Sequence, residues 1–423
     1  MKPTLSIDGP RLYRSLEALG DVGAYDDPYS GLRGVCRLAL SAADGEGRRH
    51  VVAELRAAGL EVTVDRIGNV FGRRRGLQDS LRPVMIGSHI DSVATAGRFD
   101  GCLGVLGGLE VVRTLNDARR ETVRPVVVAF FTEEEGARFG TDMLGSAVAT
   151  GRVSLAQAYA LRDAAGRSVR DELEAIGFRG EADERLTPPH AYLECHVEQG
   201  PVLRAAGRDL GVVSGVQAIC WHELLIVGKS AHAGTTPMSL RADAGVAAAR
   251  INVRLRELVA SGRFGGELRA TMGVLTPHPG LVNVVPGRVV ASVDVRNPDD
   301  AVLERAESEL VEFYAQVARE ERVTITHKRT ARTPFVPFAA SVRARVDAAA
   351  EARGLSREAI VSGAGHDAQE MARVCTAGMI FVPGEHDGIS HNPRELSTPA
   401  QCANGVNVLL DVLLSFADEA EGA

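Results

Sequence analysis

The stretch PVMIGSHID, residues 83–91, is a continuous apolar run that ends in two metal-binding side chains, His89 and Asp91. Three more stretches have the same form: PVVVAFFTEEEG (125–136), AYLECHVEQG (191–200) and GMIFVPGEHDGISHNP (378–393). An unbroken Val/Ile/Phe run is typical of a strand that is buried on both faces of a parallel sheet. Because ligands bind beyond the carboxyl ends of such strands, we predict that the four ends share one site.

Length and composition indicate a globular enzyme with more than one domain. The chain has 423 residues, of which 45% are hydrophobic and 24% are charged, and this length suits two domains rather than one core. The net charge of −7 argues against a nucleic-acid or anionic-membrane partner. The N-terminal stretch lacks the apolar core of a secretory signal, and no apolar run approaches the ~20 residues of a membrane-spanning helix.

The cysteines are scattered along the chain and form no CxxC pair. They are Cys36, Cys102, Cys195, Cys220, Cys375 and Cys402. In a chain of this length we expect free thiols in a reducing cytosol, and therefore a cytoplasmic protein. Cys195 directly precedes His196, so it should point to the opposite face of its strand and lie in the core.

The order of elements predicts a domain that is interrupted by a second one. Two helices within residues 10–60 precede a strand pair at 61–76, and a glycine-rich helix follows Asp100. The small residues of that helix would let it lie close to the sheet. Between residues 216 and 330 the pattern changes to strand–helix–strand–strand–helix–strand, the split βαβ order of a ferredoxin-like unit. Two strands of this unit flank the turn at Pro286-Gly287.

After Pro334 the α/β pattern resumes and leads to His391. We therefore predict an α/β fold with a mostly parallel sheet in a discontinuous catalytic domain, residues 1–212 and 331–423. An α+β ferredoxin-like domain, residues 213–330, is inserted into it.

The pair His89 and Asp91 suggests a supported metal ligand. Side chains two residues apart on a strand point the same way, so the carboxylate of Asp91 can accept the second imidazole N–H and fix the tautomer. The same proposed site receives Asp100, at the start of the next helix, together with His196 and His391. A His-x-Asp sequence alone is common in ordinary turns. Its combination with three more potential ligands at the same predicted site indicates a metal centre.

Imidazole and carboxylate ligands in mixture favour Zn²⁺ or a neighbouring divalent ion. With Glu135 there are five candidate ligands. A single catalytic zinc ion usually takes fewer ligands than this from the protein. If one carboxylate is shared, the set suits two ions about 3.5–4 Å apart, as in aminopeptidases. In the run Glu133-Glu134-Glu135, one acid can bind metal while a neighbour takes a proton from water. Position alone does not assign these roles.

The inserted domain contributes a second candidate set. His232 lies in the turn GKSAHAGTTPM, and Asn283 and Arg296 lie on later strands. Each can be structural: a surface histidine, a turn asparagine, a salt-bridged arginine. Alternatively, Arg296 can clamp a substrate carboxylate, and His232 and Asn283 can donate hydrogen bonds to a developing oxyanion.

These motifs together resemble the zinc-dependent amidohydrolases of the hydantoinase/carbamoylase type, within the aminopeptidase-like dinuclear metallohydrolases. The matching stretches are GSHIDSV, GRFDGCLGVLGGLEVV, FTEEEGARF, ECHVEQGPVL, GKSAHAGTTPMSLRADA, LVNVVPG, SGAGHDA and MIFVPGEHDGISHNP. The resemblance implies a metal-binding α/β domain, an inserted lid that also forms the dimer interface, and hence a homodimer.

The resemblance also implies roles for particular residues. Asp100 would bridge two zinc ions, with His89 and His196 at one ion and Glu135 and His391 at the other. Glu134 would be the general base, and Asp91 stays beside His89 as its catalytic support. The implied substrate-binding residues are His232, Asn283, Arg296, Gln199 and His366. The resemblance further implies that His232 reaches the neighbouring subunit's site. Mn²⁺, Co²⁺ or Ni²⁺ could replace zinc at such ligands.

The family divides by substrate into enzymes for N-carbamoyl-L-amino acids, allantoate and β-ureidopropionate. The sequences GRFDGCLGVLGG and TEEEGARF resemble the carbamoyl-amino-acid branch more closely than the other two. We therefore expect hydrolysis of a ureido C–N bond that releases ammonia, carbon dioxide and an L-amino acid. A dinuclear peptidase is the nearest alternative, although HAGTTPM is unlike its lid sequence. A non-catalytic binding protein would be expected to have lost metal ligands, and none is missing.

Overall fold

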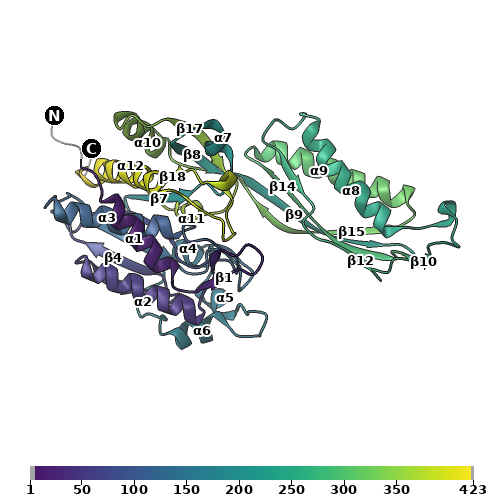
Figure 1. Cartoon of the computed structure of the whole chain (residues 1–423), viewed down its shortest axis with the longest axis horizontal. Helices are drawn as coiled ribbons and strands as arrows, with labels where there is room; N and C mark the ends of the chain where they lie inside the picture. Colours follow the sequence, from purple (N-terminus) through teal and green to yellow (C-terminus); the bar gives the residue numbers. More distant parts are fainter. Residues whose placement is uncertain (1–4, 421–423) are drawn as a thin grey trace. The chain divides into compact units, whose positions relative to one another are not determined.

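The computed structural model describes residues 5–420, so the first four residues of the N-terminal stretch lie outside the described part. The chain forms two compact units: unit 1 comprises the residues up to Ser214 and from Pro337 onward, and unit 2 comprises Gly215–Val336. The sequence predicts these boundaries after residues 212 and 330. In Figure 1, the purple and blue N-terminal elements and the yellow C-terminal helix belong to unit 1.

Unit 1 is built from strands and helices in alternation. Its strands are β1 (Ala24–Asp26), β2 (Arg33–Val35), β3 (Glu61–Val64), β4 (Val70–Arg74), β5 (Val84–His89), β6 (Val126–Phe131), β7 (Ala191–Val197), β8 (Leu210–Val216), β16 (Val336–Pro337), β17 (Arg357–Ser362) and β18 (Thr376–Val382). Its helices are α1 (Gly9–Gly20), α2 (Ala42–Ala57), α3 (Cys102–Asp117), α4 (Leu144–Thr150), α5 (Leu155–Ala160), α6 (Val169–Ile176), α7 (Val202–Ala206), α10 (Ala340–Ala352), α11 (Asp367–Met371), α12 (Pro399–Ala417) and the 3₁₀ turn η2 (His386–Gly388).

The main sheet of unit 1 has the order β16-β8-β18-β7-β5-β6-β4-β3, with β17 paired to β8. The central strands β18, β7, β5 and β6 pair in parallel, whereas β8, β4 and β3 pair antiparallel at the flanks. Strands β5, β6 and β7 are buried along their whole length. The predicted α/β class is therefore confirmed, with the parallel character concentrated in the centre of a mixed sheet.

Helices α1, α3, α10 and α12 pack together over the central strands, while α4 and α11 pack on β6, β18 and their neighbours. The glycines of α3 allow the close approach that the sequence predicts. A Cβ atom on Gly104 would lie 2.8 Å from the Cys195 carbonyl oxygen, and one on Gly108 would lie 2.9 Å from Ile86. The first turn of the helix, which begins two residues after Asp100, therefore lies directly against the ends of β5 and β7.

The C-terminal helix α12 corrects one expectation from the sequence. The helix has 19 residues, and an 18-residue window within it has a mean hydropathy of 1.3, so it is long and apolar enough to cross a membrane by length and composition. In the structure, 56% of that window is buried inside the protein, and the helix packs on α3, β7 and β18. Its apolar residues thus form part of the core of unit 1.

Unit 2 is a sheet covered by two long helices. Its elements are β9 (Ala218–Val227), β10 (Ala231–His232), η1 (Met238–Leu240), α8 (Ala244–Ala260), β11 (Arg269–Thr271), β12 (Leu275–His278), β13 (Val284–Val285), β14 (Arg288–Asn297), α9 (Asp300–Glu320) and β15 (Thr324–Thr333). The order is β11-β14-β9-β15, with β12 also paired to β14. Alternate residues of β9 are buried under the helices. The predicted split βαβ pattern is confirmed.

Two details of unit 2 differ from the sequence prediction. The single strand predicted directly after the first helix of this unit is divided into β11 and β12. The strands on either side of Pro286-Gly287 do not pair with each other, because β9 occupies one edge of β14 and β11 and β12 occupy the other. Strand β13 pairs with β10 instead, which brings the segment around Asn283 next to His232.

Candidate metal centre

The four motif-bearing strands are neighbours in the sheet, in the order β18-β7-β5-β6. His89 is the last residue of β5, and His196 lies one residue before the end of β7. The acidic run follows β6, and His391 follows β18 and the turn η2. Since these strands are parallel, their carboxyl ends lie at one edge. The predicted convergence of the four stretches is therefore present in unit 1.

A first group of donor atoms surrounds one oxygen of Asp100. Its Oδ1 atom lies 3.5 Å from Nε2 of His89 and 3.2 Å from Nε2 of His196. The three side chains are buried, and their donor atoms lie close enough together to hold a metal ion. The pairing of β5 with β7 explains this, because Val84 and Ala191 are opposite each other and each histidine follows five residues later.

A second group surrounds the other oxygen of Asp100. Its Oδ2 atom lies 3.4 Å from Nε2 of His391, which lies 3.1 Å from Oε2 of Glu135. These three residues also form a candidate metal-binding group. Asp100 thus directs one carboxylate oxygen to each group, the arrangement that a bridging ligand requires.

The backbone orients the two buried histidines. Nδ1 of His89 lies 3.0 Å from the carbonyl oxygen of Asp91, and Nδ1 of His196 lies 2.9 Å from that of Val197. A carbonyl accepts only from a protonated nitrogen, so Nδ1–H is assigned in both rings and Nε2 is the atom that faces the metal-binding side. Nε2 of His196 also accepts from the backbone N–H of Gly101 at 3.0 Å.

The carboxylate of Asp91 plays a different part from the one predicted. Its Oδ1 atom is 3.8 Å from Nδ1 of His89, beyond hydrogen-bond distance, and the main-chain carbonyl takes that contact instead. The two carboxylate oxygens accept from the backbone N–H groups of Glu134 and Glu135, each at 3.3 Å. Asp91 therefore ties the end of β5 to the acidic run after β6.

The structure separates the three adjacent glutamates. Glu133 adopts a left-handed conformation, with φ of 54°, and its carboxylate turns back to accept from the N–H groups of Arg138 and Phe139 at 3.3 and 2.8 Å. Oε2 of Glu134 lies 3.4 Å from Nε2 of His89, and Glu135 faces His391. Only the second and third acids therefore face the candidate metal groups.

The electrostatics of this cluster fit divalent cations. Asp91, Asp100 and Glu134 are buried carboxylates, and Oε1 of Glu135 is a buried oxygen without a hydrogen-bond partner among the described residues. Buried charges of this kind are normally paired or bound to metal. Burial alone would raise the pKa of Asp100, but contacts with the surrounding histidines hold it well below its ordinary value.

The pKa values of two other ionisable groups are also shifted by burial and by neighbouring charges. Hydrogen bonds to Asp100 and Glu135 raise the pKa of His391 to about 10. Burial raises the pKa of Glu134 well above its ordinary value, although His89 opposes the shift. A carboxyl group with a raised pKa can hold a proton near neutral pH.

Two tight backbone positions shape the site. Gly101 has a φ of 65°, and a Cβ atom there would lie 2.5 Å from the ring of His89. Gln199, at φ 56°, donates through Nε2 to Oδ2 of Asp100 at 2.7 Å. A residue other than glycine, such as Gln199, is strained in this left-handed backbone conformation, and such residues cluster at functional sites.

His366 lies behind the centre. It is 1% exposed, its Nε2 atom lies 2.9 Å from the hydroxyl of Ser362, and its ring packs edge-on against that of His196 at 4.5 Å. Burial and then the neighbouring His196 hold the pKa of His366 well below its ordinary value. This neutral ring supports His196, and its substrate-binding role stays a prediction.

In unit 2, His232 and Asn283 are brought together, since the N–H of Ala233 donates to the carbonyl oxygen of Asn283 at 2.9 Å. Nδ1 of His232 accepts from the N–H groups of Gly234 and Thr235 at 3.1 and 3.3 Å, which leaves its Nε2–H to donate outward. The guanidinium of Arg296 binds Asp294 on the same strand. The substrate-binding roles of these residues stay predictions.

Unit 2 contains another group of potential metal donors, Cys220, His222 and Glu307. Nε2 of His222 lies 3.0 Å from Oε1 of Glu307. The same oxygen is bound by Arg329 at 2.6 Å, so a cation already neutralises this carboxylate. We interpret the group as an ion-pair network that joins α9 to β9 and β15.

Sequence reasoning missed several residues of the centre. Glu395 accepts from the backbone N–H groups of Phe99 and Asp100, and burial and then the charge of Asp100 raise its pKa to about 7. Ser390 lies 2.8 Å from Oδ2 of Asp100. Below the histidines, buried Glu194 accepts from Ser88 at 2.7 Å. Only the proximity of Ser390 and Glu395 to His391 in the sequence could have indicated the first two.

An α/β sheet that presents two imidazole–carboxylate groups at its carboxyl edge, joined by one aspartate, defines the class of a metal-dependent hydrolase. Comparisons with known proteins agree. The family model Peptidase family M20/M25/M40 matches residues 85–415. An N-carbamoyl-L-amino-acid amidohydrolase of Rhizobium meliloti is 39% identical, with 98% of each chain covered. An allantoate amidohydrolase of Bacillus subtilis is 34% identical and covers 95% of this chain and 96% of its own.

Among solved structures, an amidase of the hydantoinase/carbamoylase family from Burkholderia multivorans matches with a TM-score of 0.92. It is 41% identical, with 99% of this chain and 100% of that chain covered. The chain belongs to the carbamoyl-amino-acid and allantoate amidohydrolase family, within the metal-dependent M20/M25/M40 hydrolases. The predicted resemblance and the prediction of a hydrolase that acts on C–N bonds are confirmed.

Proposed function

We propose that this protein hydrolyses the ureido C–N bond of an N-carbamoyl-L-amino acid and releases ammonia, carbon dioxide and the L-amino acid. The observation that supports this most strongly is the placement of Asp100. One of its oxygens faces His89 and His196, the other faces His391, and Glu134, which is not one of the proposed ligands, lies beside His89.

The cofactor in this proposal is a pair of divalent ions, with zinc expected and Mn²⁺, Co²⁺ or Ni²⁺ as substitutes. His89, His196 and Asp100 would hold one ion, and Asp100, Glu135 and His391 the other. When bound, such ions acidify water and polarise a carbonyl oxygen. Oε1 of Glu135, which has no hydrogen-bond partner within the described part of the chain, supports a ligand role for that residue.

Glu134 moves the proton in this scheme. It takes the proton of the attacking water, whose oxygen bonds to the ureido carbon, and gives it to the terminal nitrogen as the C–N bond breaks. Ammonia leaves, and the remaining carbamate loses carbon dioxide to yield the amino acid. The raised pKa of Glu134 suits a carboxyl group that must hold this proton between the two steps.

The substrate would be oriented by residues of unit 2. The outward Nε2–H of His232 and the side-chain amide of Asn283 can donate to the developing oxyanion. Arg296 would bind the substrate carboxylate. Asp294 binds both Nε and Nη2 of this guanidinium and would hold it in a fixed orientation beside the substrate carboxylate.

Allantoate and β-ureidopropionate are the alternative substrates, because the same ureido group is attacked and the allantoate amidohydrolase relative is 34% identical in sequence. They differ from an N-carbamoyl-L-amino acid in the group next to the carboxylate. A peptidase activity is a weaker alternative within the same M20/M25/M40 family.

The decisive experiment measures ammonia release by the purified, metal-loaded protein. Several N-carbamoyl-L-amino acids should be compared with their D-enantiomers, allantoate, β-ureidopropionate and a dipeptide. We expect turnover of the L-carbamoyl compounds, and loss of that turnover after chelation with recovery when metal returns. If allantoate is turned over faster than the carbamoyl compounds, allantoate replaces them as the proposed substrate. Release of a free α-amine from the dipeptide, without ammonia, would indicate a peptidase instead. Full activity in demetallated protein would reject the metal centre.

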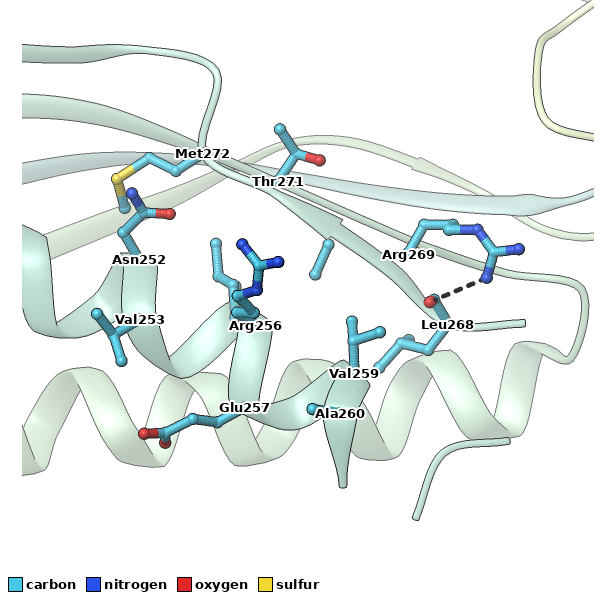
Figure 2. A pocket seen from close by; sticks show the side chains of 12 residues that line it. Asn252, Val253, Arg256, Glu257, Val259, Ala260, Leu268, Arg269, Thr271 and Met272 are labelled. Atoms are coloured by element: carbon cyan, nitrogen blue, oxygen red, sulfur yellow. Dashed lines mark hydrogen bonds between the residues drawn. The ribbon is translucent and has the colours of Figure 1, made fainter. Parts of the chain in front are cut away.

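We also propose a homodimer that forms through α8 and β11. Strand β11 is an edge of its sheet, and an edge strand can pair with another copy. Beside it, side chains of α8 and of residues 268–272 line a pocket of about 790 Å³ (Figure 2). Val253 on this surface is 58% exposed, and Arg256 and Glu257 both line it. Adjacent opposite charges suit a self-complementary contact between identical surfaces.

Light scattering at micromolar concentration tests the dimer. We expect twice the chain mass for the wild type and the chain mass for Val253→Glu, with Val202→Glu in unit 1 as an exposed control. A monomeric wild type would contradict the proposal, as would a dimer that is unaffected by Val253→Glu.

A further inference from the structure

The carboxylate of Glu395 connects two loops of the metal centre. Its Oε1 atom accepts from the backbone N–H groups of Phe99 and Asp100 at 2.8 and 3.2 Å. Its Oε2 atom lies 2.7 Å from the hydroxyl of Ser390. The first loop carries the candidate bridging ligand, and the second carries His391, the residue after Ser390.

The same hydroxyl extends the connection to the bridging side chain. Oγ of Ser390 lies 2.8 Å from Oδ2 of Asp100, the oxygen that faces His391. Glu395 therefore holds the backbone of Asp100 directly and reaches its carboxylate through Ser390. The two carboxylates share one hydroxyl, whose single proton can be donated to only one of them at a time, so the orientation of the Asp100 side chain depends on the position of Glu395.

Packing leaves little freedom for this arrangement to change. Glu395 is 7% exposed, and a Cβ atom on Gly97 would lie 2.4 Å from the Cβ of Glu395. The loop of Asp100 thus lies directly against the Glu395 side chain. A second contact joins the same loops, since the hydroxyl of Thr95 donates to the carbonyl oxygen of His391 at 3.2 Å.

We propose that Glu395 is a positioning residue that sets the orientation of Asp100, and with it the affinity of the centre for metal at the Oδ2 side. This inference rests on the proposed metal centre but not on the identity of the substrate. Hydrogen-bond partners of metal ligands fix ligand orientation, and their loss typically costs about 10–100-fold in metal affinity. Glu395 would touch neither substrate nor metal.

The test measures metal binding without substrate, by titrating the demetallated protein with Zn²⁺ against a competing chelator. In Glu395→Ala, we expect the affinity of at least one ion to fall about 10–100-fold. Glu395→Gln keeps an oxygen that can accept from the two backbone N–H groups. Because it loses only the contact with Ser390, its zinc affinity should stay within about 3-fold of that of the wild type. Circular dichroism and the melting temperature check that each variant folds.

Glu110→Ala is the matched control. Glu110 is also a buried carboxylate of unit 1, it accepts from the Asp8 N–H and from Arg11, and its loss should lower stability while leaving metal affinity unchanged. Should Glu395→Ala fail to fold, Ser390→Ala tests the same connection and should weaken the ion on the Oδ2 side. Wild-type affinity for both ions in folded Glu395→Ala, or equal losses in Glu110→Ala, would overturn the proposal. Because no substrate is used, failure of the proposed ureido hydrolysis would appear separately.

Discussion

Nε2 of His391 lies 3.4 Å from Oδ2 of Asp100, although the two residues belong to the two separate segments of unit 1. The whole of unit 2 lies between them in the sequence. The parallel strands β5 and β18 each end in a loop at the same edge of the sheet, and these loops carry the two residues. The candidate centre therefore forms only when the two segments of unit 1 fold together.

Replacement of Glu134 by Gln should separate metal binding from catalysis. The amide cannot take a proton from water, so we expect kcat to fall about 10²–10⁴-fold, the usual contribution of a general base. Zinc content, measured by elemental analysis, should match the wild type because Glu134 is not a proposed ligand. Retained kcat would remove Glu134 from the proposed mechanism, and a parallel loss of zinc would make it a ligand.

Gly101→Ala should disrupt the centre more than a simple backbone penalty would. A left-handed conformation costs a non-glycine residue about 1–2 kcal/mol, and here the new methyl group would also collide with the ring of His89. Gly177→Ala is the control, since Gly177 has a φ of 75° but nothing within 4 Å of a Cβ atom. Both variants should lower the free energy of unfolding, but only Gly101→Ala should weaken zinc binding. Equal zinc affinity in the two proteins would contradict the prediction.

Substitution of Arg296 by Ala tests the carboxylate clamp. Hydrogen bonds to a charged group are worth about 1.5–3 kcal/mol, so we expect KM for an N-carbamoyl-L-amino acid to rise about 10–100-fold. Arg296→Lys should recover only part of this loss, because an ammonium group lacks the planar fork. Steady-state kinetics distinguish the outcomes: an unchanged KM would indicate that Arg296 serves only its ion pair with Asp294.

The stability of unit 2 should depend on pH through His222. Burial, which outweighs the nearby Glu307, lowers the pKa of His222 below its ordinary value of 6.5. Since the unfolded chain binds a proton at 6.5 and the folded chain only at a lower pH, folding stability should decline as the pH falls below 6.5. Glu307, whose pKa is also lowered, acts at lower pH, below the ordinary carboxyl value of 4.5.

Thermal melts of the wild type and of His222→Gln between pH 8 and pH 5 measure this dependence. Glutamine cannot titrate but can still donate to Glu307, so its melting temperature should decline less over this range. Parallel curves for the two proteins would show that His222 does not contribute.

Much of the site could be predicted from local patterns. Apolar runs of strand length identified β5, β6, β7 and β18, and ligand-type residues at their ends pointed to one edge of the sheet. The small residues of α3 likewise indicated close packing. Such features depend on neighbours in the sequence, and periodicity reports them directly.

Other features depended on contacts between distant segments. The sequence does not distinguish the three adjacent glutamates. In the structure, the left-handed backbone at Glu133 turns its side chain away from the candidate metal centre. The contact expected between the His89 ring and the Asp91 carboxylate is replaced by a main-chain carbonyl. The pairing of β13 with β10 follows from the occupation of both edges of β14.

Local composition and periodicity are enough to predict which segments are buried strands, where a second domain interrupts the first, and which residue types can bind metal. Which carboxylate faces which histidine, and that Glu395 holds the loop of Asp100, becomes clear only from the folded structure. The reason is physical: burial and periodicity arise from the chain's local composition, whereas the direction of a buried polar side chain is set by its hydrogen-bond partners, and here those partners lie on other strands and loops.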